Sequence, residues 1–393
     1  MFKFEILHQE KKTKARLGKI KTDHGEIETP AFVAVGTAAS VKSLTPQEIS
    51  QTGTQIFFVN TFHLHFRPGE KIIKKLGGIH KFMGWNGPII SDSGGFQVFS
   101  LAREKEINLV KITEGGVEFR SPWDGTKDFL TPEESIAIQK DLGTDIILCL
   151  DDCTPYPVTH KKAEISLQRT HRWAQESLKA YKKLKSKQAL YGVVQGSVFK
   201  DLRISSVKFI SSLPFAGIAI GGVSVGESKK EMKKVLDWVG PLLPENKPRH
   251  LLGVGEIDDI FTLVKAGVDT FDCVMPTRLG RMGQILIKNP NSKIPASPAG
   301  RQNPKFTYEI TKTKFAEDKR PLDLQCDCYV CRNFTRAYIC HLFRSRELLA
   351  YRLATYHNLY FINQLMRQIR QAIKENSLEE LEKEWLSKPT INI

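Results

Sequence analysis

The chain has 393 residues, of which 41% are hydrophobic and 26% are charged. At roughly 100–200 residues per domain, this excludes a disulfide-stapled miniature and a disordered chain, and allows either a few ordinary domains or one large barrel with an appendage. Lysine and arginine number 58 against 43 acidic residues, a net charge of +15, which favours a polyanionic partner, nucleic acid above all. Because no apolar run is long enough to span a membrane and the first residues lack a secretion signal, we expect no membrane partner and a cytoplasmic protein.

Residues 1–29 predict an N-terminal β-hairpin that caps the rest of the fold. Apolar and polar residues alternate over 2–7 and again over 15–21, and the second run ends at a turn-forming Asp23-His24-Gly25. Alternation bounded by such a turn is typical of paired strands with one buried face.

Residues 30–288 predict a (β/α)₈ barrel. Eight short apolar runs are each followed by a loop and then a segment of helical period, at 31–35, 55–59, 88–90, 146–150, 190–194, 217–220, 250–254 and 268–271. Helix-start signals follow several of these runs, at Thr45-Pro46, Thr131-Pro132 and Glu256. An open doubly wound sheet is the alternative, but no G-x-G-x-x-G follows the first run.

The remainder predicts an extended loop over 289–310 and a zinc-binding helical subdomain over 311–393, docked on the barrel, with helices over 333–353 and 358–375. Cys326, Cys328 and Cys331, with His357 further along, make a closed set of three thiolates and one imidazole for one structural Zn²⁺. The alternatives are buried reduced thiols, or Cys340 or His341 as the fourth ligand. An odd total of seven cysteines also indicates a reducing compartment.

Three carboxylates follow predicted strands: Asp92 after the third, Asp151 after the fourth and Asp272 after the eighth. In a (β/α)₈ barrel the C-terminal strand ends form the active-site face, so these groups converge there with Gln195 and several glycines. A single aspartate at such a place is often only a helix N-cap, but three together weaken that interpretation.

Paired carboxylates without a metal-binding histidine suit chemistry at an acetal-like carbon, where one attacks and the other moves a proton. With a basic surface, we expect the bond to be the N-glycosidic bond of a nucleotide whose base leaves its stack. A carboxylate, an amide and a backbone N–H suit the edge of guanine. Arg278 and Arg281 would clamp phosphates, unless they are merely solvated, and Phe96 would stack on a base, unless it only packs.

Six segments resemble, in order, motifs of the tRNA-guanine transglycosylases, also called queuine tRNA-ribosyltransferases. They are SDSGGFQ (91–97), DDCTPYP (151–157), VQGS (194–197), GGVSVGE (221–227), FDCVMPTR (271–278) and the Cys/His set. The resemblance covers nearly the whole chain, and six spaced motifs are far more specific than one.

The resemblance implies a pentosyltransferase that replaces guanine at wobble position 34 of the tRNAs for Asp, Asn, His and Tyr with 7-aminomethyl-7-deazaguanine. This is a step of queuosine biosynthesis, with a covalent ping-pong mechanism. Asp272 would be the nucleophile and Asp92 the general acid/base. The residues implied to bind the base are Ser93, Gly94, Gly95, Phe96, Asp151, Gln195, Gly222 and Leu252. Those implied to contact the tRNA anticodon loop are Gly253, Val254, Gly255, Glu256, Ile257, Asp258, Asp259, Thr277, Arg278, Leu279, Gly280 and Arg281. Zinc on Cys326, Cys328, Cys331 and His357, and a homodimer, are implied as well.

Val225 stands where the resemblance places a branched residue in bacterial members, which favours the small 7-aminomethyl base; direct insertion of bulky queuine is the alternative. One departure is a 289–304 segment longer than in bacterial members. A noncatalytic tRNA-binding subunit would lack Asp92 or Asp272, a sugar glycosidase would not need the basic surface, and a zinc deaminase would need an H-x-E motif near the cysteines.

Overall fold

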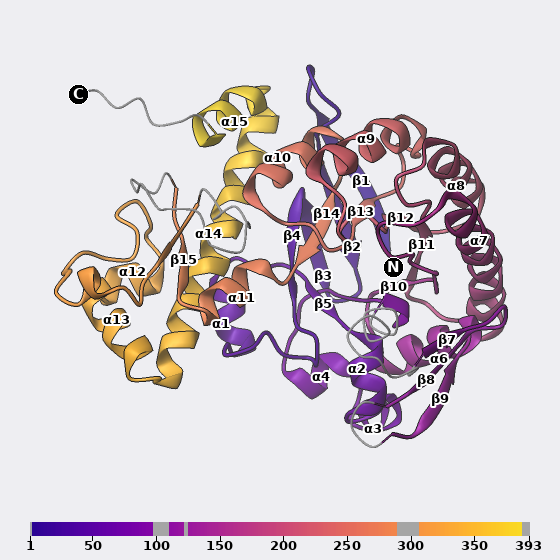
Figure 1. Ribbon diagram of the computed structural model, residues 1–393, viewed down its shortest axis with the longest axis horizontal. Coiled ribbons are helices and arrows are strands. Elements are labelled where there is room, and N and C mark those ends of the chain that lie inside the picture. The colour runs from indigo at the N-terminus through magenta and orange to yellow at the C-terminus, as the bar shows by residue number, and fades with distance from the viewer. Residues whose placement is uncertain (1, 97–109, 122–124, 289–305, 387–393) are drawn as a thin grey trace.

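The computed structural model describes residues 2–96, 110–121, 125–288 and 306–386 and has a closed barrel of parallel strands at its centre (Figure 1). The barrel strands are β4 (Ala31–Val35), β5 (Phe57–Val59), β6 (Ile89–Ser91), β10 (Ile146–Leu148), β11 (Ala189–Val194), β12 (Gly217–Ile220), β13 (Arg249–Leu251) and β14 (Thr270–Cys273). They follow one another in chain order around the barrel, and β14 pairs with β4 to close it. This confirms the predicted (β/α)₈ fold, and every predicted run overlaps one strand.

Helices surround the barrel (Figure 1). They are α1 (Pro46–Gln51), α2 (Thr61–Phe66), α3 (Glu70–Lys75), α4 (Ile79–Met83), α6 (Pro132–Leu142), α7 (His160–Lys183), α8 (Lys200–Ser212), α9 (Lys229–Val239), α10 (Ile257–Lys265) and α11 (Met275–Arg281). Thr45 and Thr131 form capping boxes at the starts of α1 and α6, as predicted. Glu256 is the N-cap residue of α10, but its side chain makes no capping hydrogen bond. Among the described helices, none is both long and apolar enough to cross a membrane.

The N-terminal segment forms three strands and not the predicted two. They are β1 (Lys3–Gln9), β2 (Arg16–Thr22) and β3 (Gly25–Thr29), in one antiparallel sheet. Gly25, at a φ of 133°, lets the chain fold back after the turn, so that residues 25–29 pair with β2 before running into β4. His24 contacts Asp145 and Arg16 contacts Asp269, the residues just before β10 and β14. The sheet therefore covers the N-terminal end of the barrel, opposite the predicted site.

A second antiparallel sheet, which the sequence did not predict, lies between β6 and α6. Its strands are β7 (Val110–Ile112), β8 (Val117–Arg120) and β9 (Lys127–Leu130). Phe119 of β8 packs on Phe62 and Phe66 of α2, and the Glu114 carbonyl accepts a 2.8 Å bond from the Trp173 indole of α7. The insertion is therefore anchored to two helices of the barrel.

The C-terminal part contains β15 (Gln284–Leu286), β16 (Thr307–Glu309), α12 (Tyr329–Asn333), α13 (Arg336–Arg344), α14 (Leu348–Glu375) and α15 (Leu378–Leu386). The predicted helix boundaries are wrong here, because the break falls at 345–347, where Arg346 has a φ of 57°, and α14 runs unbroken through His357. No glycine or proline marks that break. In the predicted 289–310 loop, 307–309 form β16, and 289–305 lie outside the described residues. Helix α14 packs on α11 and β4 and so joins this part to the barrel.

A buried ion pair joins the N-terminal sheet to the barrel. Arg16 donates through Nε (2.9 Å) and Nη2 (2.6 Å) to the two carboxylate oxygens of Asp269, and both side chains are at most 3% exposed. Removing one partner of such a pair leaves an uncompensated buried charge. We therefore expect Arg16→Met to lower the free energy of unfolding by about 3–5 kcal/mol, measured by urea denaturation.

The matched control is Lys19→Met, which lies on the same strand as Arg16 and removes an exposed ion pair with Glu26 of β3. Little change in the free energy of unfolding is expected on loss of an exposed pair, because water screens it. Equal losses for the two variants would contradict the structural role of the buried pair.

Candidate active site and metal centre

The C-terminal ends of the barrel strands surround a cavity of about 380 Å³. It is lined by both predicted catalytic residues, Asp92 and Asp272, and by six of the eight residues predicted to bind the base: Ser93, Phe96, Asp151, Gln195, Gly222 and Leu252. Gly94 and Gly95 lie just behind it, and a Cβ on Gly95 would come within 2.9 Å of the Asp151 carbonyl. Phe96 is 44% exposed at the edge of the cavity, and Gln97 lies outside the described residues.

Asp92 follows β6 and is held by the loop that follows β5. Its Oδ2 accepts a 2.5 Å bond from the Asn60 amide and its Oδ1 a 2.7 Å bond from the Thr61 backbone N–H. The Thr61 hydroxyl donates to the Asp92 carbonyl at 2.5 Å, so both the backbone and the side chain are fixed. Donors to both oxygens hold the carboxylate in one orientation at the cavity that it lines.

Asp272 lies at the C-terminal end of β14 and is held through one oxygen. Oδ1 accepts from the Gly253 backbone N–H at 3.1 Å and lies 3.2 Å from His250 Nε2. The residue is 8% exposed, and that exposure is to the cavity it lines. This arrangement leaves a carboxylate of fixed orientation facing an enclosed space, as a nucleophile requires.

Asp151 follows β10, and burial disfavours its ionised form. Its Oδ2 accepts a 2.7 Å bond from the Gln195 amide and its Oδ1 a 3.4 Å bond from Ser93 Oγ. Burial raises the pKa of Asp151 to about 6 despite these donors. The carboxylate is therefore ionised in neutral solution but poorly satisfied, so it can still accept hydrogen bonds from a ligand.

Arg203 of α8 orders the loops that carry Gln195 and Gly222. Its buried guanidinium donates to the carbonyls of Ser197 (2.6 Å), Gly221 (2.8 Å) and Gly222 (2.7 Å). Gly222 has a φ of 64°, and a Cβ there would collide with Gln195 Oε1. Burial lowers the pKa of Arg203 to about 10, so the group remains a cation at neutral pH.

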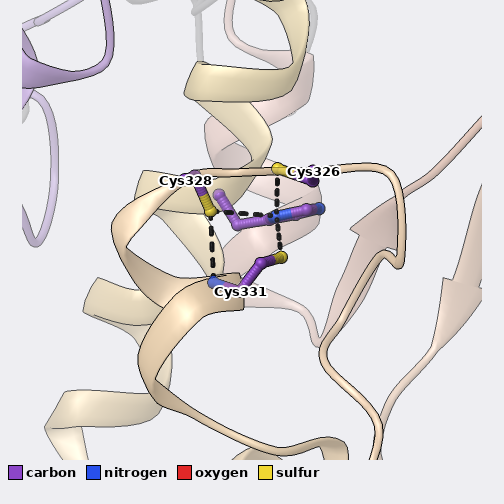
Figure 2. A group of neighbouring side chains, drawn as sticks. Cys326, Cys328 and Cys331 are labelled. Carbon is purple, nitrogen blue, oxygen red and sulfur yellow. Dashed lines mark hydrogen bonds between the residues drawn. The ribbon is translucent and has the colours of Figure 1, made fainter.

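The predicted metal ligands meet in the C-terminal part (Figure 2). His357 Nδ1 lies 3.8, 3.6 and 3.4 Å from the sulfurs of Cys326, Cys328 and Cys331. His357 Nε2 donates to the Leu286 carbonyl at 2.8 Å, which leaves the Nδ1 lone pair facing the sulfurs. These four residues could hold a metal ion. Cys340, considered as a substitute ligand, instead contacts the Lys312 carbonyl.

Comparison with known proteins places the chain in a family. The family described as Queuine tRNA-ribosyltransferase matches residues 10–390. The Queuine tRNA-ribosyltransferase of Halothermothrix orenii is 49% identical over 385 residues, 98% of this chain and 97% of the relative. That of Desulforamulus reducens is 48% identical over 384 residues, 98% of each chain. The chain belongs to the queuine tRNA-ribosyltransferase family. The predicted class of enzyme, a pentosyltransferase, is thereby confirmed.

In this ribosyltransferase, the residues predicted to contact tRNA form two groups. Gly253–Asp259 comprise the loop after β13 and the start of α10, where Lys229 forms ion pairs with Glu256, Asp258 and Asp259. Thr277–Arg281 lie on α11, where Arg278 is exposed and lines the cavity. Thr277 and Gly280 are buried, and a Cβ on Gly280 would come within 2.9 Å of the Thr355 backbone of α14.

Sequence reasoning missed four residues of the site of this family member: Asn60, Thr61, Arg203 and His250. Asn60 and Thr61 follow β5 directly, so the rule that selected residues beyond strands 3 to 8 would have found them had it been applied to strand 2. Arg203 lies within a helix and His250 within a strand. Neither position carries a local signal, because each acts through tertiary contacts.

The raised pKa of Asp151 predicts that the ionised carboxylate lowers the stability of the folded protein. The folded protein binds the Asp151 proton more tightly than the unfolded chain, whose value is 3.8. The protonated carboxyl therefore stabilises the fold below about pH 4, and this stabilisation is lost as the pH rises through 6. We expect Asp151→Asn to raise stability by about 1–3 kcal/mol at pH 7.5, and by about half as much at pH 5.

Thermal unfolding of the two proteins at both pH values measures this difference. The control is Asp237→Asn, a substitution of an exposed aspartate on α9, for which little change is expected at either pH. A loss of stability in Asp151→Asn at both pH values would show that the buried Asp151 carboxylate does not destabilise the fold.

Proposed function

We propose that the enzyme exchanges guanine at the wobble position of tRNAs with GUN anticodons, those for Asp, Asn, His and Tyr, for 7-aminomethyl-7-deazaguanine. The observation that carries this proposal is the pair of aspartates, Asp92 and Asp272, that face one cavity together with a guanine-complementary set of groups. The names of the relatives support tRNA as the substrate, and the net charge of +15 suits a polyanion.

The exchange begins at Asp272. A lone pair of its free carboxylate oxygen forms a bond to C1′ of the ribose, and the electron pair of the C1′–N9 bond leaves with guanine. In the second half, N9 of the incoming base attacks C1′ and the electron pair of the ester bond returns to Asp272. One covalent intermediate thus links two half-reactions, which is a ping-pong scheme that needs no external energy source.

Asp92 carries the proton in this scheme. The outgoing guanine must gain a proton at N9 and the incoming base must lose one, so the complete exchange is proton-neutral. The ionised carboxylate of Asp92, held by Asn60 and Thr61, is a suitable acceptor for the proton of the incoming base. Both catalytic carboxylates are present, which argues against the noncatalytic tRNA-binding subunit.

The base is read by groups at the ends of β10, β11 and β12. Asp151 would accept from N1–H and the 2-amino group, while the Gln195 amide and the Gly222 N–H would donate to O6. Phe96 would stack on the ring. Val225 and Leu252 both line the cavity, and the branched side chain of Val225 would narrow it, which favours the small aminomethyl group over the bulky cyclopentenediol of queuine.

The tRNA would lie across the open mouth of the barrel. Arg278 is the exposed cation at the edge of the cavity and would contact a phosphate beside the wobble nucleotide. The carboxylates of Glu256, Asp258 and Asp259 are partly neutralised by Lys229, so backbone groups of that loop are better suited to RNA than its side chains. We place the enzyme in the cytoplasm, as a homodimer.

The metal centre would hold one structural Zn²⁺. In a tetrahedral zinc site with three sulfurs and one nitrogen, ordinary bond lengths separate nitrogen from sulfur by about 3.5 Å. The observed distances of 3.4, 3.6 and 3.8 Å match this separation. Four protein ligands complete the coordination, so bound zinc would tie α12 and α14 together and take no part in the exchange.

Loss of one zinc ligand should release the metal and destabilise the C-terminal part. We expect Cys328→Ser to bind far less than one zinc per chain by elemental analysis, and to lower the unfolding midpoint by more than about 5 °C. Cys340→Ser is the matched control, because Cys340 is a buried cysteine outside the group. Full zinc content in Cys328→Ser would refute the assignment.

The exchange reaction is tested with unmodified tRNA and labelled bases. We expect incorporation of 7-aminomethyl-7-deazaguanine into acid-precipitable tRNA, and a fall of more than about 1,000-fold in Asp272→Asn, which lacks the nucleophile. Asp92→Asn should also be strongly impaired, and Asp237→Asn should be normal.

Two results would change the proposal. Preferential use of queuine would show that Val225 does not restrict the pocket and that the enzyme inserts queuine directly. No incorporation of either base, with tRNA binding intact, would favour a noncatalytic tRNA-binding subunit.

A further inference from the structure

His250 of β13 is a fully buried imidazole inside the barrel. Its neighbours in the ladder are Thr270 and, two residues on, Asp272. Because alternate residues of a strand share one face, the side chains of Thr270 and Asp272 point the same way. Both contact the imidazole ring. Thr270 Oγ1 lies 2.9 Å from Nδ1 and Asp272 Oδ1 lies 3.2 Å from Nε2. Phe58 stacks on the ring, with centroids 5.8 Å apart and planes at 19°.

These contacts determine where the imidazole proton lies. An ionised carboxylate can only accept hydrogen bonds, so Nε2 must carry the hydrogen that faces Asp272. The Thr270 hydroxyl can then donate to Nδ1, so that both ring nitrogens have a hydrogen-bond partner. Thr270 therefore holds His250 in the tautomer that donates to the carboxylate.

The two donors to Asp272 share one oxygen. His250 Nε2 and the Gly253 backbone N–H both bond Oδ1. Among the residues that the structure describes, no hydrogen-bond donor contacts Oδ2. The carboxylate is thus fixed with one oxygen bound to the protein and the other available to the cavity that Asp272 lines.

We propose that His250 is a positioning residue for the nucleophile, which holds Asp272 so that Oδ2 attacks the ribose. This rests on the proposed function. When Oδ2 forms its bond to C1′, the C1′–N9 pair leaves with guanine and Oδ1 becomes the carbonyl oxygen of the ester. When the incoming base displaces the ester, the pair of the C1′–Oδ2 bond returns to the carboxylate, and the donors at Oδ1 stabilise the charge that reappears. His250 therefore positions the nucleophile in the first half-reaction and stabilises the departing carboxylate in the second.

The test compares base exchange in the full-length enzyme and three variants, with tRNA and 7-aminomethyl-7-deazaguanine as substrates. His250→Phe keeps a flat ring against Phe58 but removes the donor, and we expect kcat to fall about 10–100-fold while KM for tRNA and for the base changes less than about 3-fold. His250→Gln restores an N–H near the same place and should recover kcat to within about 5-fold of the wild type. Thr270→Val leaves the ring but releases Nδ1, and kcat should fall about 3–10-fold.

The outcomes separate this inference from the proposed function. If the wild type shows no exchange, the proposed function fails. If the wild type is active and Asp272→Asn is not, the proposed function stands. The His250 and Thr270 variants then decide whether His250 has the positioning role. Unchanged kcat in His250→Phe, or equal losses in the Phe and Gln variants, would overturn the positioning role. If His250→Phe does not fold, the kcat of Thr270→Val tests the positioning role instead. An unchanged kcat in that variant would overturn the role.

Discussion

In a closed barrel of parallel strands, every strand ends at the same rim, and this constraint determines the chemistry of the molecule. Pairing of β14 with β4 closes the ring and brings Asp272, at the end of the last strand, to the same cavity as Asp92. In an open sheet of this strand order, β6 and β14 would lie five strands apart, so Asp92 and Asp272 could not act together on a single nucleotide. The N-terminal sheet covers the opposite end of the barrel, and the cavity lies at the rim.

The three aspartates at that rim have different surroundings, which is why the proposed function gives them different roles. Asp92 has an N–H donor on each oxygen, from Asn60 and Thr61. Asp272 has both donors on one oxygen, and Asp151 is so poorly compensated that burial raises its pKa to about 6. In the proposed mechanism, a proton carrier, a nucleophile and a ligand-binding acceptor would thus come from one residue type. Other interactions in the fold offset the free energy lost by burying the ionised Asp151 carboxylate.

The metal centre stands apart from this chemistry but shares its scaffold. His357 lies on α14, the long helix that packs on β4 and α11, and its ring is fixed by the Leu286 carbonyl of β15. Gly280 of α11 allows the close approach of α14. A metal ion held by these four residues would therefore support α14, the helix against which the Arg278-bearing helix α11 packs.

The sequence predicted the features that depend on local pattern. Short apolar runs are enough to locate barrel strands, and the Thr45 and Thr131 caps are local signals that the structure confirms. The third N-terminal strand and the inserted β7–β9 sheet were missed, because strand pairing is a tertiary event. The break before α14 was misplaced because no glycine or proline marks it.

Prediction of the site from the sequence is limited in the same way. Spacing brought Asp92, Asp151 and Asp272 together correctly, since the barrel topology places strand ends on one face. His250 and Arg203 escaped notice because a buried histidine and a mid-helix arginine are identified only by the atoms they contact. Residues that react stand at predictable places, whereas residues that hold them do not.

The most direct test of the central claim is to identify the covalent intermediate. The enzyme is incubated with an unmodified anticodon stem-loop, denatured and digested with trypsin and ribonuclease, and the peptide that carries the ribosyl adduct is sequenced by mass spectrometry. The account predicts an adduct on Asp272, in the peptide that ends at Arg278, and none in Asp272→Asn. An adduct on Asp92, or base exchange that proceeds without any adduct, would contradict it.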